Sequence, residues 1–176
     1  MPGVLGVVAS GAGGVEQRLR VELVAPAVRR GWRVAVTLTP TAARWLADNG
    51  ELDRLAELSD LPVRSTSRLP NQPKPHPVPD CFLFAPATAN SVAKLALGIA
   101  DNQALTVLCE ALGTPGLPVV LHPQVNQAHA AHPAYPGHLA VLAAAGVRIV
   151  SGESAQPWQR LLDVVDEVTG RAHRGV

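Results

Sequence analysis

Small and polar residues gather in four loops, each directly after or at the end of a short apolar run. The four segments are "SGAGG" (10–14), "TLTPTA" (37–42), "PATAN" (86–90) and "HPQVN" (122–126). They are rich in hydroxyls and amides, and none of them contains Lys or Arg. A phosphate bound at these loops would therefore be held by backbone N–H groups, hydroxyls and helix N-termini.

The nucleotide-binding motifs that these loops lack restrict the class of nucleotide that they could bind. In "GAGGVE", Glu16 stands where G-x-G-x-x-G requires its third glycine, and no acid follows the second apolar run to bind a ribose. A nicotinamide dinucleotide is therefore disfavoured. No G-K-[ST] occurs, which excludes a Walker-type site. A mononucleotide phosphate fits better, with hydroxyls from Ser10 and Thr39, and simple helix capping by such residues is the alternative.

Histidines concentrate in one later segment, "HPQVNQAHAAHPAYPGH", at His122, His129, His132 and His138. Zinc sites usually add a Cys or carboxylate ligand, and this segment has neither. We therefore predict locally bonded or solvated histidines and no metal site. A Ser-His-Asp hydrolase is also disfavoured, because the sequence has no G-x-S-x-G.

A sheet must position these loops, and the chain alternates β-rich runs with helical stretches, which is typical of a parallel sheet. Apolar runs predict strands at 4–10, 33–39, 81–87, 118–123 and 147–151, with a weaker one at 61–66. Pro26 predicts a kink or break in the first helix. The prolines of 67–80 predict a loop, and an amphipathic helix is expected near 157–169. We predict an α/β fold, with one domain over 1–176 and a Rossmann-like open parallel sheet covered by helices on both faces.

Composition limits the partners. The chain has 176 residues, 47% of them hydrophobic and 16% charged, with a net charge of +1. This balance leaves no basic field for nucleic acid, and no apolar run approaches the roughly 20 residues of a membrane span. Cys81 and Cys109 are too few for a disulfide framework, and the N-terminus lacks a basic leader. We expect a cytoplasmic protein that binds neither nucleic acid nor membranes.

Two motifs resemble those of the flavin-containing cysteine decarboxylases. "APATANSVAKLALGIADN" resembles the PASANT or PATANT signature of that family, which is followed by a helix ending in G-x-x-D-N. "PQVNQAHA" (123–130) aligns with its second motif, P-x-M-N-x-x-M-W. The family includes phosphopantothenoylcysteine decarboxylase and the enzymes that decarboxylate the C-terminal cysteine of lantibiotic and related peptides. The similarity extends to about residue 151.

The resemblance implies an FMN-binding homo-oligomer, either a trimer or a dodecamer built of trimers. It implies that the phosphate contacts Ser10, Gly11 and Ala12, helped by the hydroxyls that end the second strand. The flavin would lie against "PATAN", and Asn126 would hold the substrate carboxylate. The implied cofactor-binding residues are Ser10, Gly11, Ala12, Thr37, Thr39, Pro86, Ala87, Thr88, Ala89 and Asn90. Asp101 and Asn102, which close the first signature, are expected to be structural.

The family reaction implies an FMN-dependent oxidation of a cysteine, loss of CO2 and an enethiol product. The position of the family histidine falls on Gln72, an amide that cannot act as a base near neutral pH. His76, four residues away, is the candidate substitute base, and ordinary solvent exposure of His76 is the alternative. The second motif has Val125, His129 and Ala130 in place of two methionines and a tryptophan. A cysteine-containing substrate clamp is also missing after the last strand.

These departures favour a peptide with a C-terminal cysteine over pantothenoylcysteine, although a small thiol substrate stays open. We therefore expect an enzyme, an FMN-dependent cysteine decarboxylase. The alternative is an FMN-binding flavoprotein or partner subunit that does not decarboxylate. A flavin prenyltransferase is a weaker reading, because these loops lack basic residues for a second phosphate.

Overall fold

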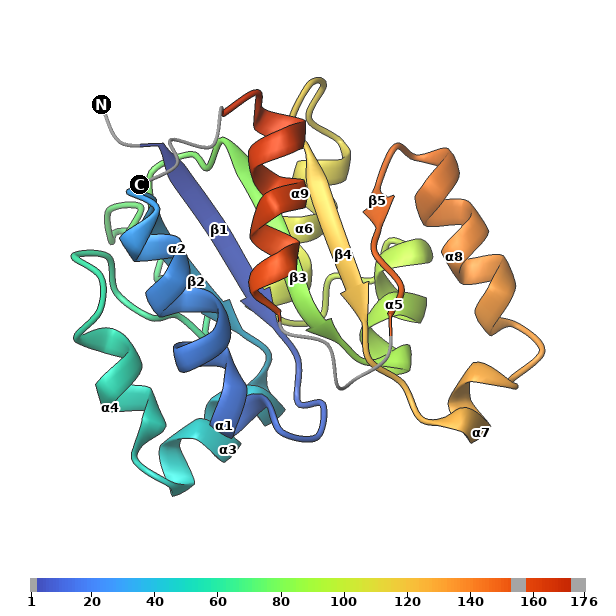
Figure 1. The fold of residues 1–176 in the computed structure, drawn as a ribbon, viewed down its shortest axis with the longest axis horizontal. Coiled ribbons are helices and arrows are strands. Elements are labelled where there is room, and N and C mark those ends of the chain that lie inside the picture. The colour runs from blue at the N-terminus through green and yellow to red at the C-terminus, as the bar shows by residue number, and fades with distance from the viewer. Residues whose placement is uncertain (1–2, 153–157, 172–176) are drawn as a thin grey trace.

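The computed structural model describes residues 3–152 and 158–171, and its centre is a sheet of five parallel strands (Figure 1). The strand order is β2-β1-β3-β4-β5. The bounds are β1 Val4–Ala9, β2 Arg33–Leu38, β3 Cys81–Ala87, β4 Val119–Pro123 and β5 Arg148–Ile149. The predicted open parallel sheet of Rossmann-like type is confirmed.

The central strands are buried on both faces, as their continuous apolar runs predict. All six residues of β1 and all seven of β3 are buried. Val7 of β1 pairs with Val36 of β2 on one side and with Leu83 of β3 on the other. The strand that follows β1 in the chain lies on one side of it, and all later strands lie on the other side. The strand order therefore reverses between β1 and β3, at their carboxyl ends.

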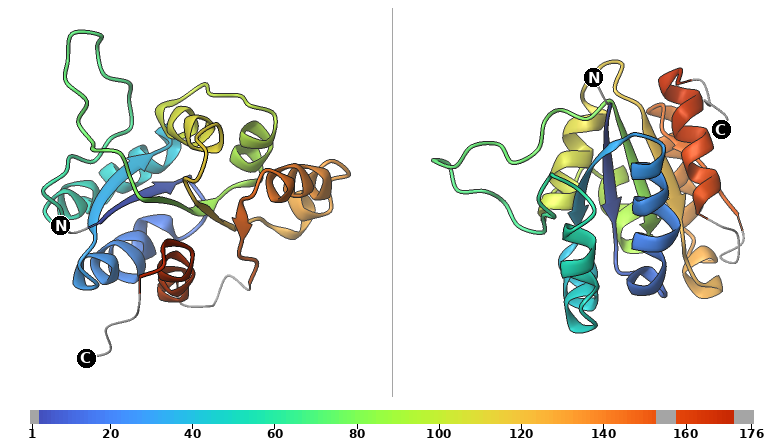
Figure 2. Two further views of the ribbon diagram at one scale, coloured as in Figure 1. Left: turned by 90° about the horizontal axis from the view of Figure 1, so that it is seen from above. Right: turned by 60° about the vertical axis from the view of Figure 1, so that its left-hand side comes forward.

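Helices cover both faces of this sheet (Figure 2). One face carries the first helical segments and the last helix, and the other carries α5 and α6. Helices α3 and α4 lie beside the edge strand β2, and α8 lies beside β5 (Figure 1). The bounds are α1 Val15–Arg18, η1 Leu19–Val24, α2 Ala25–Arg29, α3 Pro40–Asp48, α4 Glu51–Ala56, α5 Ala89–Ala96, α6 Gln103–Leu112, α7 Gln127–Ala130, α8 Tyr135–Ala144 and α9 Gln159–Thr169.

The first helix is interrupted as Pro26 predicts, because η1 is a π-helical segment that ends just before α2 begins. Pro26 lies in the first turn of α2, which continues directly from η1. Because proline has no N–H to donate to the preceding turn, a regular α-helical bonding pattern cannot run through this position. The helix expected near 157–169 is α9, and residue 157 lies outside the described residues.

The strand predicted at 61–66 is wrong. Residue Arg64 makes only an isolated parallel bridge with Thr37. Pro62 lacks an N–H for a strand ladder, and the chain continues into the proline-rich loop. The described sheet therefore has β2 at its edge.

The proline-rich loop 67–80 extends away from the body of the protein (Figure 2). Two side-chain contacts attach the loop to the rest of the protein. Ser67 Oγ donates to Gln103 Oε1 at 3.0 Å, and His76 Nε2 lies 2.6 Å from the carbonyl oxygen of Pro62. Within the loop, the Arg68 guanidinium donates to the carbonyl oxygens of Leu69, Pro70 and Gln72.

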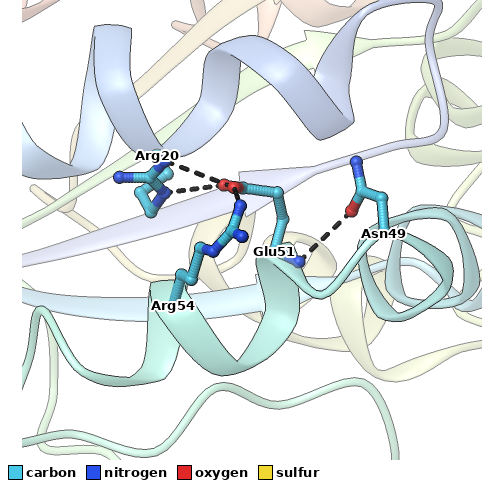
Figure 3. A network of polar contacts seen from close by, with 4 residues as sticks. All are labelled: Arg20, Asn49, Glu51 and Arg54. Carbon is cyan, nitrogen blue, oxygen red and sulfur yellow. Dashed lines mark hydrogen bonds and ion pairs between the residues drawn. The ribbon is translucent and has the colours of Figure 1, made fainter.

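An ion-pair network around the buried carboxylate of Glu51 joins α4 to η1 (Figure 3). The Glu51 carboxylate accepts from Arg20 Nε at 2.6 Å and from Arg54 Nη1 at 2.8 Å. The backbone N–H of Glu51 donates to Asn49 Oδ1, which orders the start of α4. In the described parts of the chain, no helix is long and apolar enough to cross a bilayer.

Candidate functional site

The ends of β1 and β3 are joined by one serine. Ser10 donates through both its backbone N–H (2.9 Å) and its hydroxyl (3.0 Å) to the carbonyl oxygen of Pro86. The same hydroxyl accepts from the backbone N–H of Thr88 at 3.1 Å. Ligands of open parallel sheets bind outside the carboxyl ends of the strands at such a reversal point, so this junction is the expected place for one.

Two neighbouring cavities open at this junction, and Gly11, Thr88 and Asn90 line both. The smaller has a volume of about 280 Å³ and the larger about 530 Å³. The other residues of the smaller cavity are Ser10, Thr39, Pro40, Thr41, Ser91, Lys94, Asp101 and Asn102. The other residues of the larger cavity are Ala12, Gly13, Ala89, Gln124, Val125, Asn126 and His129.

The smaller cavity is lined by the N-cap residues of three helices. The side chains of Thr39, Thr88 and Asn102 accept a backbone N–H from the first turn of α3, α5 and α6 respectively. Helix N-termini carry partial positive charge and backbone N–H groups without an intrahelical partner. Together with the surrounding hydroxyls, they make a cavity that suits a phosphate.

Gly11 is required by close packing in the same place. A Cβ built on Gly11 would lie 2.5 Å from Thr41 Cγ2 and 3.0 Å from Thr41 Cβ. Only glycine therefore lets the loop after β1 approach the start of α3.

Asn126 sits at the larger cavity as the N-cap of α7. Its Oδ1 accepts from the backbone N–H of His129 at 2.8 Å. Because the oxygen of the amide is engaged in the cap, its NH2 group is the part that can donate to a ligand. This is the hydrogen-bonding character that a carboxylate needs.

Gln124 is a residue of the larger cavity that the sequence did not single out. Its Nε2 donates to the carbonyl oxygen of Gly13 at 2.6 Å, and its backbone N–H donates to Ala87 O at 2.9 Å. Its Oε1 is buried and has no hydrogen-bond partner among the described residues. A buried acceptor without a donor is costly, so Gln124 Oε1 fits a ligand that brings an N–H group. Its position directly after β4 was the available signal.

Lys94 corrects the expectation that a phosphate here would meet no cation. The loops themselves contain no Lys or Arg, but α5 brings Lys94 to the smaller cavity, where Nζ lies 2.6 Å from Asp101 Oδ2. Lys94 stands three and four residues after Ser91 and Asn90, which places all three on one side of the helix. That helical spacing could have identified it.

Most of the predicted site residues line the two cavities at the strand ends. The exceptions are Thr37, His76, Pro86 and Ala87. Pro86 and Ala87 are buried within β3, where the Pro86 carbonyl receives the two Ser10 bonds. Thr37 points to the opposite side of β2 from Val36 and Leu38, and it lines a third cavity of about 620 Å³ beneath the proline-rich loop.

His76 also lines this third cavity, which shares no lining residue with the two cavities at the strand ends. Burial lowers the pKa of His76, and the bond to the Pro62 carbonyl opposes this shift. Within one chain, the ring is therefore directed at the base of the loop.

The histidine-rich segment forms no metal centre in the described chain, where no three His, Cys, Asp or Glu side chains are grouped to hold an ion. His122 is buried, and its Nδ1 lies 2.8 Å from the carbonyl oxygen of Val150. His132 Nδ1 accepts from the backbone N–H of Ala134. The segment that the sequence identified as lacking a clamp includes residues 153–157, which lie outside the described residues.

The two adjoining cavities fit a flavin nucleotide. The smaller offers hydroxyls, helix N-termini and a cation, and the larger offers room, amide donors and an orphaned acceptor beside it. A Rossmann-like sheet with this pair of cavities at its reversal point is typical of a flavin-binding α/β protein. The chain belongs to the Flavoprotein family, whose sequence profile matches residues 5–174.

Solved structures are similar over nearly the whole chain. The FMN-dependent cysteine decarboxylase TvaF from thioviridamide biosynthesis is 26% identical with a TM-score of 0.75, covering 95% of this chain and 98% of its own. The FMN-dependent cysteine decarboxylase SpaF is 21% identical with a TM-score of 0.73, covering 96% and 97%. HAL3 from Cryptococcus neoformans is 18% identical with a TM-score of 0.72, covering 96% of each chain. A search of curated protein sequences found no match. The resemblance inferred from the motifs is confirmed.

Proposed function

We propose that this protein is an FMN-dependent enzyme that oxidatively decarboxylates the C-terminal cysteine of a peptide. The observation that carries the proposal is the Ser10–Thr88 junction, at which a cavity lined by hydroxyls and helix N-termini lies beside a larger one lined by Asn126. The similarity to TvaF, a cysteine decarboxylase, supports the same reaction.

Each group has a role in this proposal. Ser10, Gly11, Ala12 and Thr39 hold the phosphate end, and Thr88, Ala89 and Asn90 hold the ring. Pro86 and Ala87 support these contacts from β3. The bound flavin supplies the acceptor for the hydride of the cysteine Cβ–H bond. The Asn126 NH2 group orients the substrate carboxylate. Once Cβ is oxidised to a thioaldehyde, CO2 can leave from the adjacent Cα, because the C=S group accepts the electron pair and an enethiol remains.

The proposed catalytic base and the proposed oligomeric state depend on each other. His76 faces away from the two cavities of its own chain, so its proposed role as base requires a neighbouring copy to bring the histidine to them. We therefore propose a homo-oligomer, a trimer or a dodecamer of trimers. A cytoplasmic location is proposed as well, since Cys81 and Cys109 are both free cysteines.

The test has two stages. Purified protein incubated with FMN and then desalted should retain absorbance near about 450 nm, as bound flavins do. Peptides ending in Cys should then lose about 46 mass units, which is CO2 plus two hydrogens passed to the flavin. The same peptides ending in Ser, or in cysteine amide, are the controls and should not react. Flavin binding without any reaction of the Cys peptides would indicate the non-decarboxylating flavoprotein instead, and absence of flavin binding would contradict both.

A further inference from the structure

We propose that Lys94 is the cation that binds the phosphate of the flavin nucleotide, and that Asp101 is a positioning residue that holds the Lys94 ammonium at the smaller cavity. This inference rests on the proposed function, because it takes FMN as the ligand. It adds a cation to the hydroxyls and helix termini of this cavity, which should strengthen the preference for a phosphorylated flavin over the same flavin without phosphate.

The placement of Lys94 is the first step. Lys94 and Asp101 are the only charged residues that line the smaller cavity in the described chain. The two side chains form an ion pair at this cavity, with Lys94 Nζ 2.6 Å from Asp101 Oδ2, and 27% of the Lys94 side chain is exposed. Ser91 of the same helix is buried in the wall, so the side of α5 that carries Lys94 faces the cavity.

The second step is the number of donors. A lysine ammonium has three N–H donors, and Asp101 accounts for one of them. The remaining donors are available at a cavity whose other groups are hydroxyls, an amide and the first turns of α3, α5 and α6. A phosphate dianion in this place satisfies them, and charge-assisted hydrogen bonds of this kind are among the stronger ones in proteins.

The third step concerns Asp101, whose charge would repel an anion if it stood alone. The carboxylate precedes the N-cap of α6 and is favourable to that helix. Lys94 cancels its charge toward the cavity, and Asp101 in return limits the positions that the long lysine side chain can take. A purely structural pair would stabilise the fold slightly and would not distinguish one flavin from another.

The experiment compares the affinities of FMN and riboflavin by flavin fluorescence quenching, for the wild type, Lys94→Gln and Lys94→Arg. Lys94→Gln should weaken FMN binding by about tenfold to a hundredfold, the size of one charge-assisted hydrogen bond, and leave riboflavin binding within about twofold. Lys94→Arg, which keeps the charge, should recover part of the loss. The FMN affinity of the wild type should also fall with added salt, and less steeply in Lys94→Gln.

The matched control is Lys74→Gln, at the only other lysine in the sequence. Lys74 lies on the proline-rich loop and lines the separate cavity of its own chain, so its substitution should leave the ratio of the FMN affinity to the riboflavin affinity unchanged. The ratio of the two affinities is insensitive to a general loss of folding, because that would weaken both ligands together.

Several results would overturn the inference while leaving the proposed function standing. These are equal weakening of both flavins by Lys94→Gln, no change in either, or a wild type that does not discriminate between them. A wild type that binds neither flavin would instead contradict the proposed function itself.

Discussion

The hydroxyl of Ser10 and the backbone N–H of Thr88 lie 3.1 Å apart, although 78 residues separate them in the chain. This bond fixes the loop after β1 to the loop after β3, and the same hydroxyl donates to Pro86 O. Both cavities of the site border on the two loops that it joins. The geometry of the proposed flavin site therefore depends in part on this buried side chain.

Ser10→Ala should weaken FMN binding by about tenfold or more, because it leaves the Thr88 N–H without its acceptor and removes two of the three hydrogen bonds between the loops. The measurement is equilibrium FMN binding by fluorescence. Ser59→Ala is the control, since Ser59 Oγ likewise donates to a backbone carbonyl (Val34) and accepts a backbone N–H (Leu61), away from both cavities. Equal losses in the two variants would contradict a specific role for Ser10.

Gly11→Ala should destabilise the protein by about 1–3 kcal/mol, because its Cβ would overlap Thr41 and force the loop apart from α3. Urea unfolding measures the change, and FMN binding should fall with it. Gly137→Ala is the control, since a Cβ there meets nothing within 4 Å. A Gly11→Ala protein as stable as the Gly137→Ala protein would show that the close approach to Thr41 is unimportant.

Asn126→Asp should separate the two functions of this residue. Aspartate caps a helix as well as asparagine does, so the start of α7 and the affinity for FMN should be kept. The new negative charge faces the proposed substrate carboxylate, and kcat/KM for Cys-terminated peptides should fall by at least about a hundredfold. Asn49→Asp, at another asparagine that accepts a backbone N–H, is the control and should retain activity. Retained activity in Asn126→Asp would remove Asn126 from substrate binding.

Glu51 should make stability depend on pH in the acid range. The hydrogen bond from Arg20, with a smaller contribution from Arg54, lowers the pKa of Glu51 below its ordinary value of 4.5, against the opposing effect of burial. A carboxyl with a lowered folded pKa stabilises the protein above its unfolded pKa and loses this contribution as the pH falls through the folded value. Glu51→Gln should therefore lower Tm at pH 7 and have a smaller effect below about pH 4.

The control for this prediction is Glu57→Gln, at an exposed carboxylate next to the end of the same helix. It should leave Tm nearly unchanged at both pH values. A Glu51→Gln effect that is the same at pH 7 and at acid pH would show that the ion pairs in Figure 3 contribute nothing that depends on charge.

The sequence by itself determined the sheet and the location of the site. Continuous apolar runs such as β1 and β3 bury both faces of a parallel sheet, and the polar loops that follow them must meet at its carboxyl edge. Ser10, Thr39 and Thr88 could be identified for this reason, since their position depends only on where a strand ends. The break at Pro26 was equally local, because the missing N–H acts within its own helix.

Only the tertiary structure decided which side chains reach the cavities. Lys94 lies a turn into α5, and it matters because the packing of α5 and the course of the chain to Asp101 turn it toward the phosphate-sized space. Gln124 could be identified as a residue of the larger cavity only from the tertiary structure, in which its amide donates to the carbonyl oxygen of Gly13, 111 positions away in the chain. The family resemblance assigned Thr37 to the cofactor and His76 to the role of substitute base. The alternation of β2 and the path of the proline-rich loop place them at a different cavity, because side-chain direction is set by packing in three dimensions and not by position in the sequence.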